Sequence, residues 1–178
     1  MPQFSTGATL LSGLSGNATA LQNMLTSMTQ DFGQTSHGDA FQLANAELSS
    51  NGRAGARQAV IILTDGVANR PTGIDPIGYA IGAAEGLKLN GIEIFGVGIG
   101  SAIAIEDIED YASTPLADYA FHVSDYDSLQ PALDDIIANL QATVTEPPET
   151  QLSAPAPLAL FGLGLGMLAL YRRRIAAV

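Results

Sequence analysis

The carboxylate of Asp65 comes one residue, Thr64, after an unbroken apolar run, Val60 to Leu63. Such a run between turn-forming residues is typical of a fully buried parallel strand. Ligands of open parallel sheets bind outside the carboxyl ends of the strands, so the sequence places an acid at the ligand-binding edge. Asp-Gly pairs also form turns, and the alternative interpretation is that Asp65 only caps the turn at Gly66.

The other residues that could do chemistry form no catalytic constellation. We interpret His37 as a solvated loop residue near the rim of this edge and His122 as a satisfied strand residue. The glycines of "GVGIG" lack the third, helix-opening glycine of a dinucleotide site, and the acidic segments "IEDIEDYA" and "SDYDS" lack the spacing of a calcium loop. With no cysteine for thiol catalysis or thiolate metal binding, the sequence indicates a binding protein and not an enzyme.

Charge is distributed unevenly along the 178 residues, whose length favours one main domain with an appendage. The net charge is −11, and all 18 acidic residues lie at or before Glu149. Since Arg172 to Arg174 contribute +3, the preceding body carries −14. Nucleic-acid binding depends on neutralising phosphates, so this acidic body excludes nucleic acid as an expected partner.

The elements that must position Asp65 alternate between helix and strand. Helices are predicted around residues 19–28, after the loop "GQTSH", and over residues 76–90, where Gly91 suits the C-terminal cap. Strands are predicted at residues 60–64, in "IEIFGVGIG" and in "YAFHVS". A last helix opens at Asp127 or Ser128, and its expected buried residues are Leu129, Leu133, Ile136, Ile137 and Leu140. This order predicts an α/β fold, a mainly parallel, Rossmann-like sheet with helices on both faces.

Five segments in order, "FSTGATLLSGLS", "GQTSHGDAFQLA", "AVIILTDGVAN", "LKLNGIEIFGVGIG" and "YAFHVSDYDSLQPALDDI", resemble the von Willebrand factor type A (VWA) domain over about residues 2–142. The resemblance implies a divalent cation, usually Mg²⁺, held at the top of the sheet in a metal-ion-dependent adhesion site. It implies direct coordination by Thr35 and coordination through water by Asp65. Hard oxygen ligands suit Mg²⁺, which keeps several of its waters when it binds.

The family's first strand, with its Asp-x-Ser-x-Ser loop, has no counterpart in the sequence. We therefore expect residues 1–142 to form a partial VWA fold that lacks its first strand and helix and binds Mg²⁺ weakly or not at all. A truncated gene model predicts that in-frame upstream DNA encodes the missing loop. A decayed remnant without ligand is the alternative.

The last part of the chain differs in composition. Residues 143–157 read as a proline-rich linker, and residues 158–171 run without a charge until Arg172 to Arg174. As a helix this run spans about 21 Å, short of the roughly 30 Å hydrocarbon core, and a core helix is the alternative. The segment resembles a variant of the PEP-CTERM sorting signal, with Pro155-Ala156-Pro157 in place of the usual motif. The resemblance implies export and processing by an exosortase-type enzyme, with a hydrophobic helix over residues 158–178 and the arginines cytoplasmic.

The expected function is an exported, surface-associated adhesion module that engages a protein or an extracellular polysaccharide. The alternative from another class is a non-enzymatic subunit of a metal- and ATP-dependent assembly, although the sequence contains no phosphate-binding loop.

Overall fold

The computed structural model describes residues 1–29 and 33–142, in which two small sheets stand side by side. Strands β1 (Pro2–Phe4) and β2 (Ala8–Leu10) form an antiparallel pair, with Gln3 opposite Thr9. Strands β3 (Ala59–Thr64), β4 (Glu93–Ile99) and β5 (Ala120–Val123) form a parallel sheet in that order. The register places Ile62 opposite Gly96 and Gly98 opposite His122. The predicted parallel sheet is therefore present.

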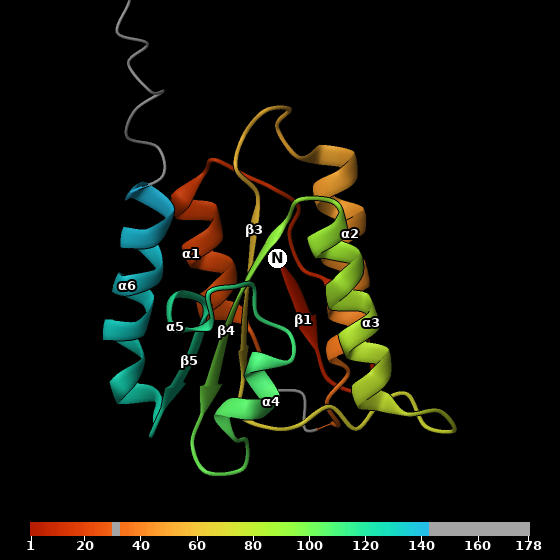
Figure 1. Cartoon of the computed structure of the whole chain (residues 1–178). Helices are drawn as coiled ribbons and strands as arrows, with labels where there is room; N and C mark the ends of the chain where they lie inside the picture. Colours follow the sequence, from red (N-terminus) through yellow and green to blue (C-terminus); the bar gives the residue numbers. More distant parts are fainter. Residues whose placement is uncertain (30–32, 143–178) are drawn as a thin grey trace, which may run out of the picture. The chain divides into compact units, whose positions relative to one another are not determined.

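Helices cover both faces of the parallel sheet (Figure 1). On one side α2 (His37–Asn51) packs against α3 (Pro76–Leu89), and on the other lie α1 (Ala18–Ser27) and α6 (Leu129–Ala142). The short elements α4 (Ile105–Glu109), α5 (Leu116–Tyr119) and the 3₁₀ turn η1 (Tyr126–Ser128) connect the strands. Among the described residues, no helix has the length and apolar content needed to cross a bilayer.

Local sequence chemistry sets the ends of these helices. The side chain of Asn17 accepts a hydrogen bond from the backbone N–H of Ala20, and Asp75 does the same for Ile77 at the start of α3. Proline follows at the first position of α3, where no N–H is required. Gly91, with φ of 73°, ends the same helix in the left-handed conformation that glycine adopts without strain.

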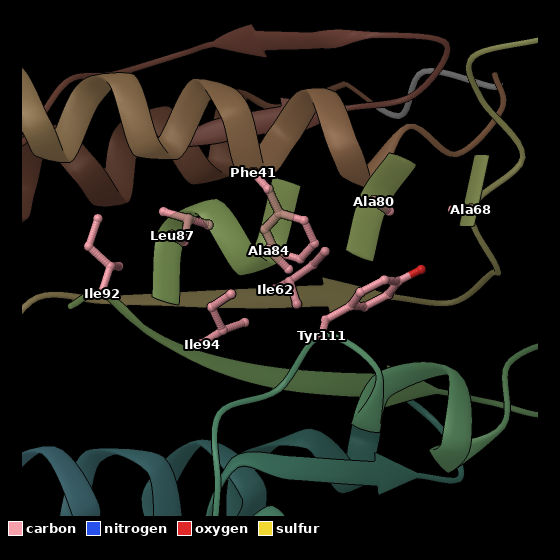
Figure 2. Packing of buried hydrophobic residues seen from close by; sticks show 9 residues of the cluster. All are labelled: Phe41, Ile62, Ala68, Ala80, Ala84, Leu87, Ile92, Ile94 and Tyr111. Carbon is pink, nitrogen blue, oxygen red and sulfur yellow. The ribbon is translucent and has the colours of Figure 1, made fainter. Parts of the chain in front are cut away.

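The core on the α2 and α3 side is aromatic at its centre (Figure 2). Phe41 and Tyr111 contact each other edge to face, with ring centroids 5.5 Å apart, and both are about 1% exposed. Around them lie aliphatic residues from α3 and the sheet: Ile62, Ala80, Ala84, Leu87, Ile92 and Ile94. Phe41 is the fully buried α2 residue of this core, and Leu48 of the same helix packs against it.

The second core lies on the α6 side and is centred on Phe95, Val97, Ile99 and Ile136. Leu129, Leu133 and Leu140 pack against it, as predicted for this helix. The prediction that Ile137 is buried was wrong, because its side chain is 47% exposed. Adjacent helical residues are separated by about 100°, so Ile136 and Ile137 cannot both face the sheet centre.

Strand β3 corrects the prediction of a fully buried strand at Val60 to Leu63. Ile62 is 4% exposed, but Ile61 and Leu63 are 41% and 40% exposed. The reason is position, since β3 is an outer strand of the parallel sheet and, within residues 1–29 and 33–142, no strand pairs with it on the side away from β4. An apolar run in the sequence predicts a strand, but it does not predict whether neighbouring elements bury that strand.

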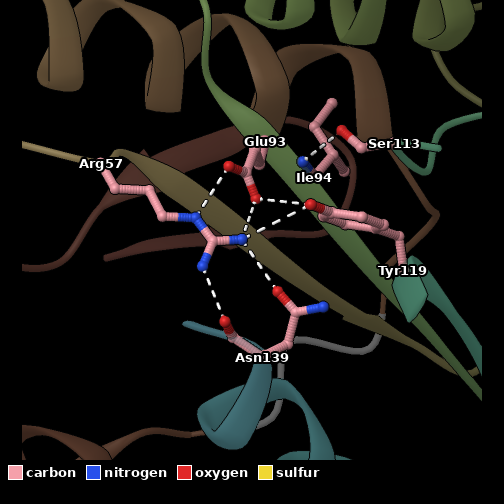
Figure 3. A network of polar contacts seen from close by, with 6 residues as sticks. All are labelled: Arg57, Glu93, Ile94, Ser113, Tyr119 and Asn139. Atoms are coloured by element: carbon pink, nitrogen blue, oxygen red, sulfur yellow. Dashed lines mark hydrogen bonds and ion pairs between the residues drawn. The ribbon is translucent and has the colours of Figure 1, made fainter. Parts of the chain in front are cut away.

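Arg57 ties the N-terminal ends of the sheet to α6 (Figure 3). Its guanidinium pairs with both carboxylate oxygens of Glu93 and donates at 2.8 Å to the backbone and side-chain oxygens of Asn139. The Tyr119 hydroxyl donates to the same carboxylate at 2.9 Å. Hydrogen bonds from Arg57 lower the pKa of Glu93. Nearby, the backbone N–H of Ser113 donates to the Ile94 carbonyl at 2.9 Å, and the Ser113 hydroxyl oxygen accepts from the Ile94 N–H at 3.0 Å.

Residues Met1–Leu140 form one compact unit. The predicted linker (residues 143–157), the hydrophobic segment (residues 158–178) and the arginine cluster lie outside the described residues, so these boundaries remain predictions.

Candidate functional site

Three loops meet at the carboxyl edge of the strands. The backbone N–H of Ser36 donates to the carbonyl of Ser5, just after β1, at 2.9 Å. The N–H of Asn69, in the loop after β3, donates to the carbonyl of Thr35 at 2.9 Å, and the N–H of Thr35 donates to the Asn69 side chain at 2.8 Å. These bonds fix the loop before α2 against the ends of β1 and β3.

Thr35 and Asp65 lie together at this edge. Both line a cavity of about 710 Å³ that also borders β1 and β3. A Cβ atom added to Gly66 would lie 3.6 Å from Thr35 Oγ1, so the turn after Asp65 runs beside the threonine. The Asp65 side chain is exposed and accepts a 3.4 Å hydrogen bond from the Tyr126 hydroxyl. The structure therefore brings together two residues that are 30 positions apart in the sequence.

The chemistry of this pair is that of a hard-oxygen site, with one hydroxyl and one carboxylate. Mg²⁺ uses one or two protein carboxylates and keeps several waters, so these ligands fit a hydrated divalent cation. Within the described residues, no group of three or more histidine, cysteine or acidic side chains could hold a metal. The pair therefore supplies part of a coordination shell, and water or a partner must supply the rest.

The prediction that His37 is solvated was wrong, because the side chain is fully buried beneath the site. Its Nε2 lies 2.9 Å from Thr64 Oγ1 and its Nδ1 lies 3.4 Å from the Tyr111 hydroxyl. The Thr64 hydroxyl donates a hydrogen bond to the Gly66 carbonyl at 2.9 Å, so the Thr64 oxygen accepts a hydrogen bond from the N–H at His37 Nε2. Burial lowers the pKa of His37 to about 4. The neutral imidazole thus fixes Thr64, and Thr64 fixes the turn that presents Asp65.

Asp39 is a residue of the site region that sequence reasoning missed. In the first turn of α2 it accepts 2.7 Å hydrogen bonds from the Ser36 hydroxyl and the Tyr79 hydroxyl. The hydrogen bond to Asp39 raises the pKa of Tyr79. The spacing Ser-x-x-Asp before a helix was a usable signal, since acids there favour the helix N-terminus. The link to Tyr79, 40 residues away, was not readable.

The other candidates have structural roles. His122 Nε2 lies within 2.8 and 3.0 Å of the carbonyls of Gly100 and Ile103, as expected for a satisfied strand residue. In the acidic segments, Asp107 accepts from the Ala104 N–H at 2.9 Å and Asp125 accepts from the Ser128 N–H at 2.9 Å. The hydrogen bonds from Ser128 lower the pKa of Asp125. These acids cap turns.

Among known protein families, the model of the von Willebrand factor type A domain matches residues 2–136. Among curated proteins, collagen alpha-1(XII) chain from Oryctolagus cuniculus is 29% identical over 138 residues. The match takes in 78% of this chain but 19% of the collagen chain. The sequence therefore spans about a fifth of the length of that relative.

Solved structures share the fold. Proximal thread matrix protein 1 from the mussel byssus is 25% identical with a TM-score of 0.65, over 78% of this chain and 34% of that one. A structure of the same mussel protein with a zinc-occupied MIDAS motif has a TM-score of 0.62 at 25% identity, over 76% and 33% of the two chains. Manganese-loaded TRAP protein from Plasmodium vivax has a TM-score of 0.58 at 25% identity, over 76% and 54%.

Proposed function

Because the chain belongs to the von Willebrand factor type A domain family, we propose that it is a non-enzymatic adhesion module at the cell surface or outside the cell. Its partner is a protein or an extracellular polysaccharide. The observation that carries the proposal is the convergence of Thr35 and Asp65 on the loop-bearing edge of the sheet. The collagen chain and byssus matrix protein among the relatives support an extracellular role.

We further propose that this edge binds a hydrated divalent cation, Mg²⁺, and binds it weakly, because the family's Asp-x-Ser-x-Ser loop has no counterpart in the sequence. The zinc-occupied and manganese-loaded relatives support a divalent ion in this family. Thr35 and Asp65 would hold the ion, which would supply a Lewis-acidic position for a carboxylate or hydroxyl of the partner. His37 and Thr64 would keep the Asp65 turn in place without contacting the ion.

Replacement of Asp65 by Asn is expected to weaken binding of Mn²⁺, used as a paramagnetic probe for Mg²⁺, by about tenfold or more, because a charged ligand is lost. Thr35→Val removes the hydroxyl with little change in volume and is expected to weaken binding in the same direction. Water-proton relaxation in a Mn²⁺ titration measures both effects.

The matched control is Asp135→Asn, which removes an exposed acid from α6 and leaves the net charge equal to that of Asp65→Asn. Equal weakening by both substitutions would show nonspecific attraction to an acidic surface and would refute the site. Circular dichroism of each variant checks that the fold is retained.

We also propose that, before any processing, residues 158–171 anchor the protein in a membrane with Arg172 to Arg174 cytoplasmic, and that an exosortase-type enzyme then cleaves near Pro155 to Pro157. The support is the uncharged 14-residue run and its flanks. Mass spectrometry of protein from the native cell surface is expected to find a C-terminus close to residue 157. An intact C-terminus at Val178 in all of the surface protein would contradict processing.

A further inference from the structure

We propose that Arg70 is a partner-binding residue, whose guanidinium takes the carboxylate of an aspartate or glutamate side chain from a protein partner. This role rests on the adhesion function proposed above, because it needs a partner, but it does not require Thr35 and Asp65 to hold a cation. Arg70 lies in the loop after β3 and is not among the residues that line the cavity beside those two residues.

The backbone of Arg70 is attached to the loop that carries Thr35. Its N–H donates to the Thr35 carbonyl at 3.2 Å, and the N–H of Asn69 donates to the same carbonyl at 2.9 Å. Asp65 lies five residues earlier in the same connection between β3 and α3. In Figure 1 this yellow connection extends outward beyond the start of α3. Arg70 is therefore held beside the edge at which a partner of Thr35 and Asp65 would bind.

Among the described residues, Arg70 is the one arginine or lysine at this edge of the sheet. The other three lie just before a strand: Arg53 and Arg57 precede β3, and Lys88, in the last turn of α3, precedes β4. Residues just before parallel strands lie at the opposite end of the sheet from residues just after them. An anionic group that approaches the site edge therefore meets a basic side chain only at Arg70.

The Arg70 guanidinium has no acidic partner within the described part of the chain. The ion pairs there join Arg57 to Glu93 and Lys88 to Glu85, and neither involves Arg70. The whole chain has 18 acidic residues against seven basic ones, so acids are in excess. The cation at the site edge is thus available to a carboxylate from outside the chain.

The hydrogen bonding of this guanidinium is incomplete as well. Nη1 donates to the Thr72 hydroxyl at 3.3 Å, whereas Nε is shielded from solvent and has no hydrogen-bond partner among the described residues. Burial of an unpaired donor is unfavourable, and a hydrogen bond of 3.3 Å offers little resistance to rotation of the side chain. A bound group that draws the guanidinium outward would give Nε the acceptor that it lacks.

The shape of the guanidinium fits a carboxylate. Its N–H donors lie in one plane as a fork, which matches the two oxygens of a carboxylate in a bidentate pair. Such charge-assisted pairs are roughly twice as strong as neutral hydrogen bonds. A carboxylate is also the group that the proposed cation would accept, so one acidic segment of a partner could engage both positions.

The surroundings of Arg70 favour a protein over an acidic polysaccharide. The body of the chain carries −14, and this charge opposes the approach of a polymer with an anion on every unit. Two apolar side chains lie close to Arg70 in the sequence, Ile74 in the same loop and Ile77 in the first turn of α3, and they are 57% and 37% exposed. A single acidic side chain with apolar neighbours, as a protein segment provides, complements both features.

The test uses the full 178-residue chain labelled with nitrogen-15, in metal-free buffer, with the peptide acetyl-Leu-Glu-Leu-amide as the probe. The Nε–H signal of Arg70 is followed by NMR and is assigned by its loss in Arg70→Met. We expect this signal to shift saturably as the probe is added. The matched peptide acetyl-Leu-Gln-Leu-amide has the same shape without the charge and should bind at least about tenfold more weakly.

Three substitutions locate the site. Arg70→Met removes the guanidinium but keeps an apolar stem, and we expect probe binding, measured by the shifts of backbone signals at residues 66–72, to weaken about tenfold. Its unfolding temperature should equal or exceed that of the wild type, because an unpaired buried donor is removed. Arg70→Lys keeps the charge without the planar fork and should retain part of the binding. Arg53→Met, the matched control, removes the same charge from an exposed residue at the other end of the sheet and should leave binding unchanged.

Equal binding of the two peptides, or equal effects of the substitutions at residues 70 and 53, would overturn the assignment of Arg70. A lower unfolding temperature for Arg70→Met would show that the side chain serves the loop structure and would also overturn it. Tighter binding of a galacturonate trisaccharide than of the glutamate peptide would refute a protein as the partner. The Mn²⁺ titration of Asp65→Asn tests the cation separately, so failure at one position is distinguishable from failure at the other.

Discussion

Replacement of Gly96 by Val is expected to destabilise the protein by about 3 kcal/mol, the upper end of the cost of overpacking a core. Gly96 lies in the buried centre of β4, and a Cβ added there would lie 2.4 Å from Cγ2 of Ile108. Ile108 is itself fully buried, so its side chain has little free space to move into, and either Ile108 or the helix α4 that carries it must shift. Guanidinium denaturation measures the change, and we expect the melting temperature to fall by about 10 °C.

Gly82→Ala is the matched control, with the opposite expected sign. Gly82 lies inside α3, and a Cβ added there meets no atom within 4 Å. Alanine in a helix interior is more favourable than glycine by about 0.5–1 kcal/mol, so this variant should be more stable than the wild type. A Gly96→Val variant as stable as the wild type would show that β4 and α4 are not packed in contact.

Acidification is expected to remove about 3 kcal/mol of stability through His37 alone. The pKa of His37 is about 4 in the folded protein, against 6.5 for an unperturbed histidine. Between these values the unfolded chain binds a proton that the folded chain does not, so the free energy of unfolding falls as pH falls. The contribution is fully present above pH 6.5 and is lost by about pH 4, at about 1.4 kcal/mol per pH unit.

His37→Gln isolates this effect, because glutamine retains an N–H donor for Thr64 but does not titrate in this range. We expect the unfolding free energy of the wild type to decrease between pH 7 and pH 4 by about 3 kcal/mol more than that of the variant. The chain has two histidines, so NMR titration of a His122→Gln variant reports on His37 alone. Parallel stability curves, or a His37 resonance that titrates near pH 6.5, would contradict the buried neutral imidazole.

The sequence was sufficient wherever a local pattern determines the structure. The apolar periodicity and the C-terminal cap at Gly91 predicted α3 to within a residue of its observed end. The alternation of strands and helices predicted the parallel sheet. The rule that parallel strands end at one edge predicted where Asp65 would lie, and the adjacent position of Thr35 followed from the family resemblance.

The failures concern residues whose environment is set by distant partners. His37 follows a loop in the sequence, and its burial depends on Thr64 and Tyr111, which are 27 and 74 residues away. Ile61 and Leu63 have the chemistry of a central strand, but β3 lies at an edge of its sheet. Asp39 and Tyr79 join two helices through one hydrogen bond, which no spacing rule encodes. In each case the missing information was tertiary.

The Arg57 network determines how the domain would respond to mechanical load. Asn139 lies three residues before Ala142, where α6 ends, and beyond it the chain continues to Val178. Tension on that continuation enters through the last turn of α6 and passes from Asn139 to Arg57 and Glu93. The pull is therefore shared with the roots of β3 and β4 instead of peeling the helix from the sheet. Thr35 and Asp65 lie at the opposite ends of the strands. A load applied to the end of α6 would therefore act on the end of the sheet that lies away from these two residues.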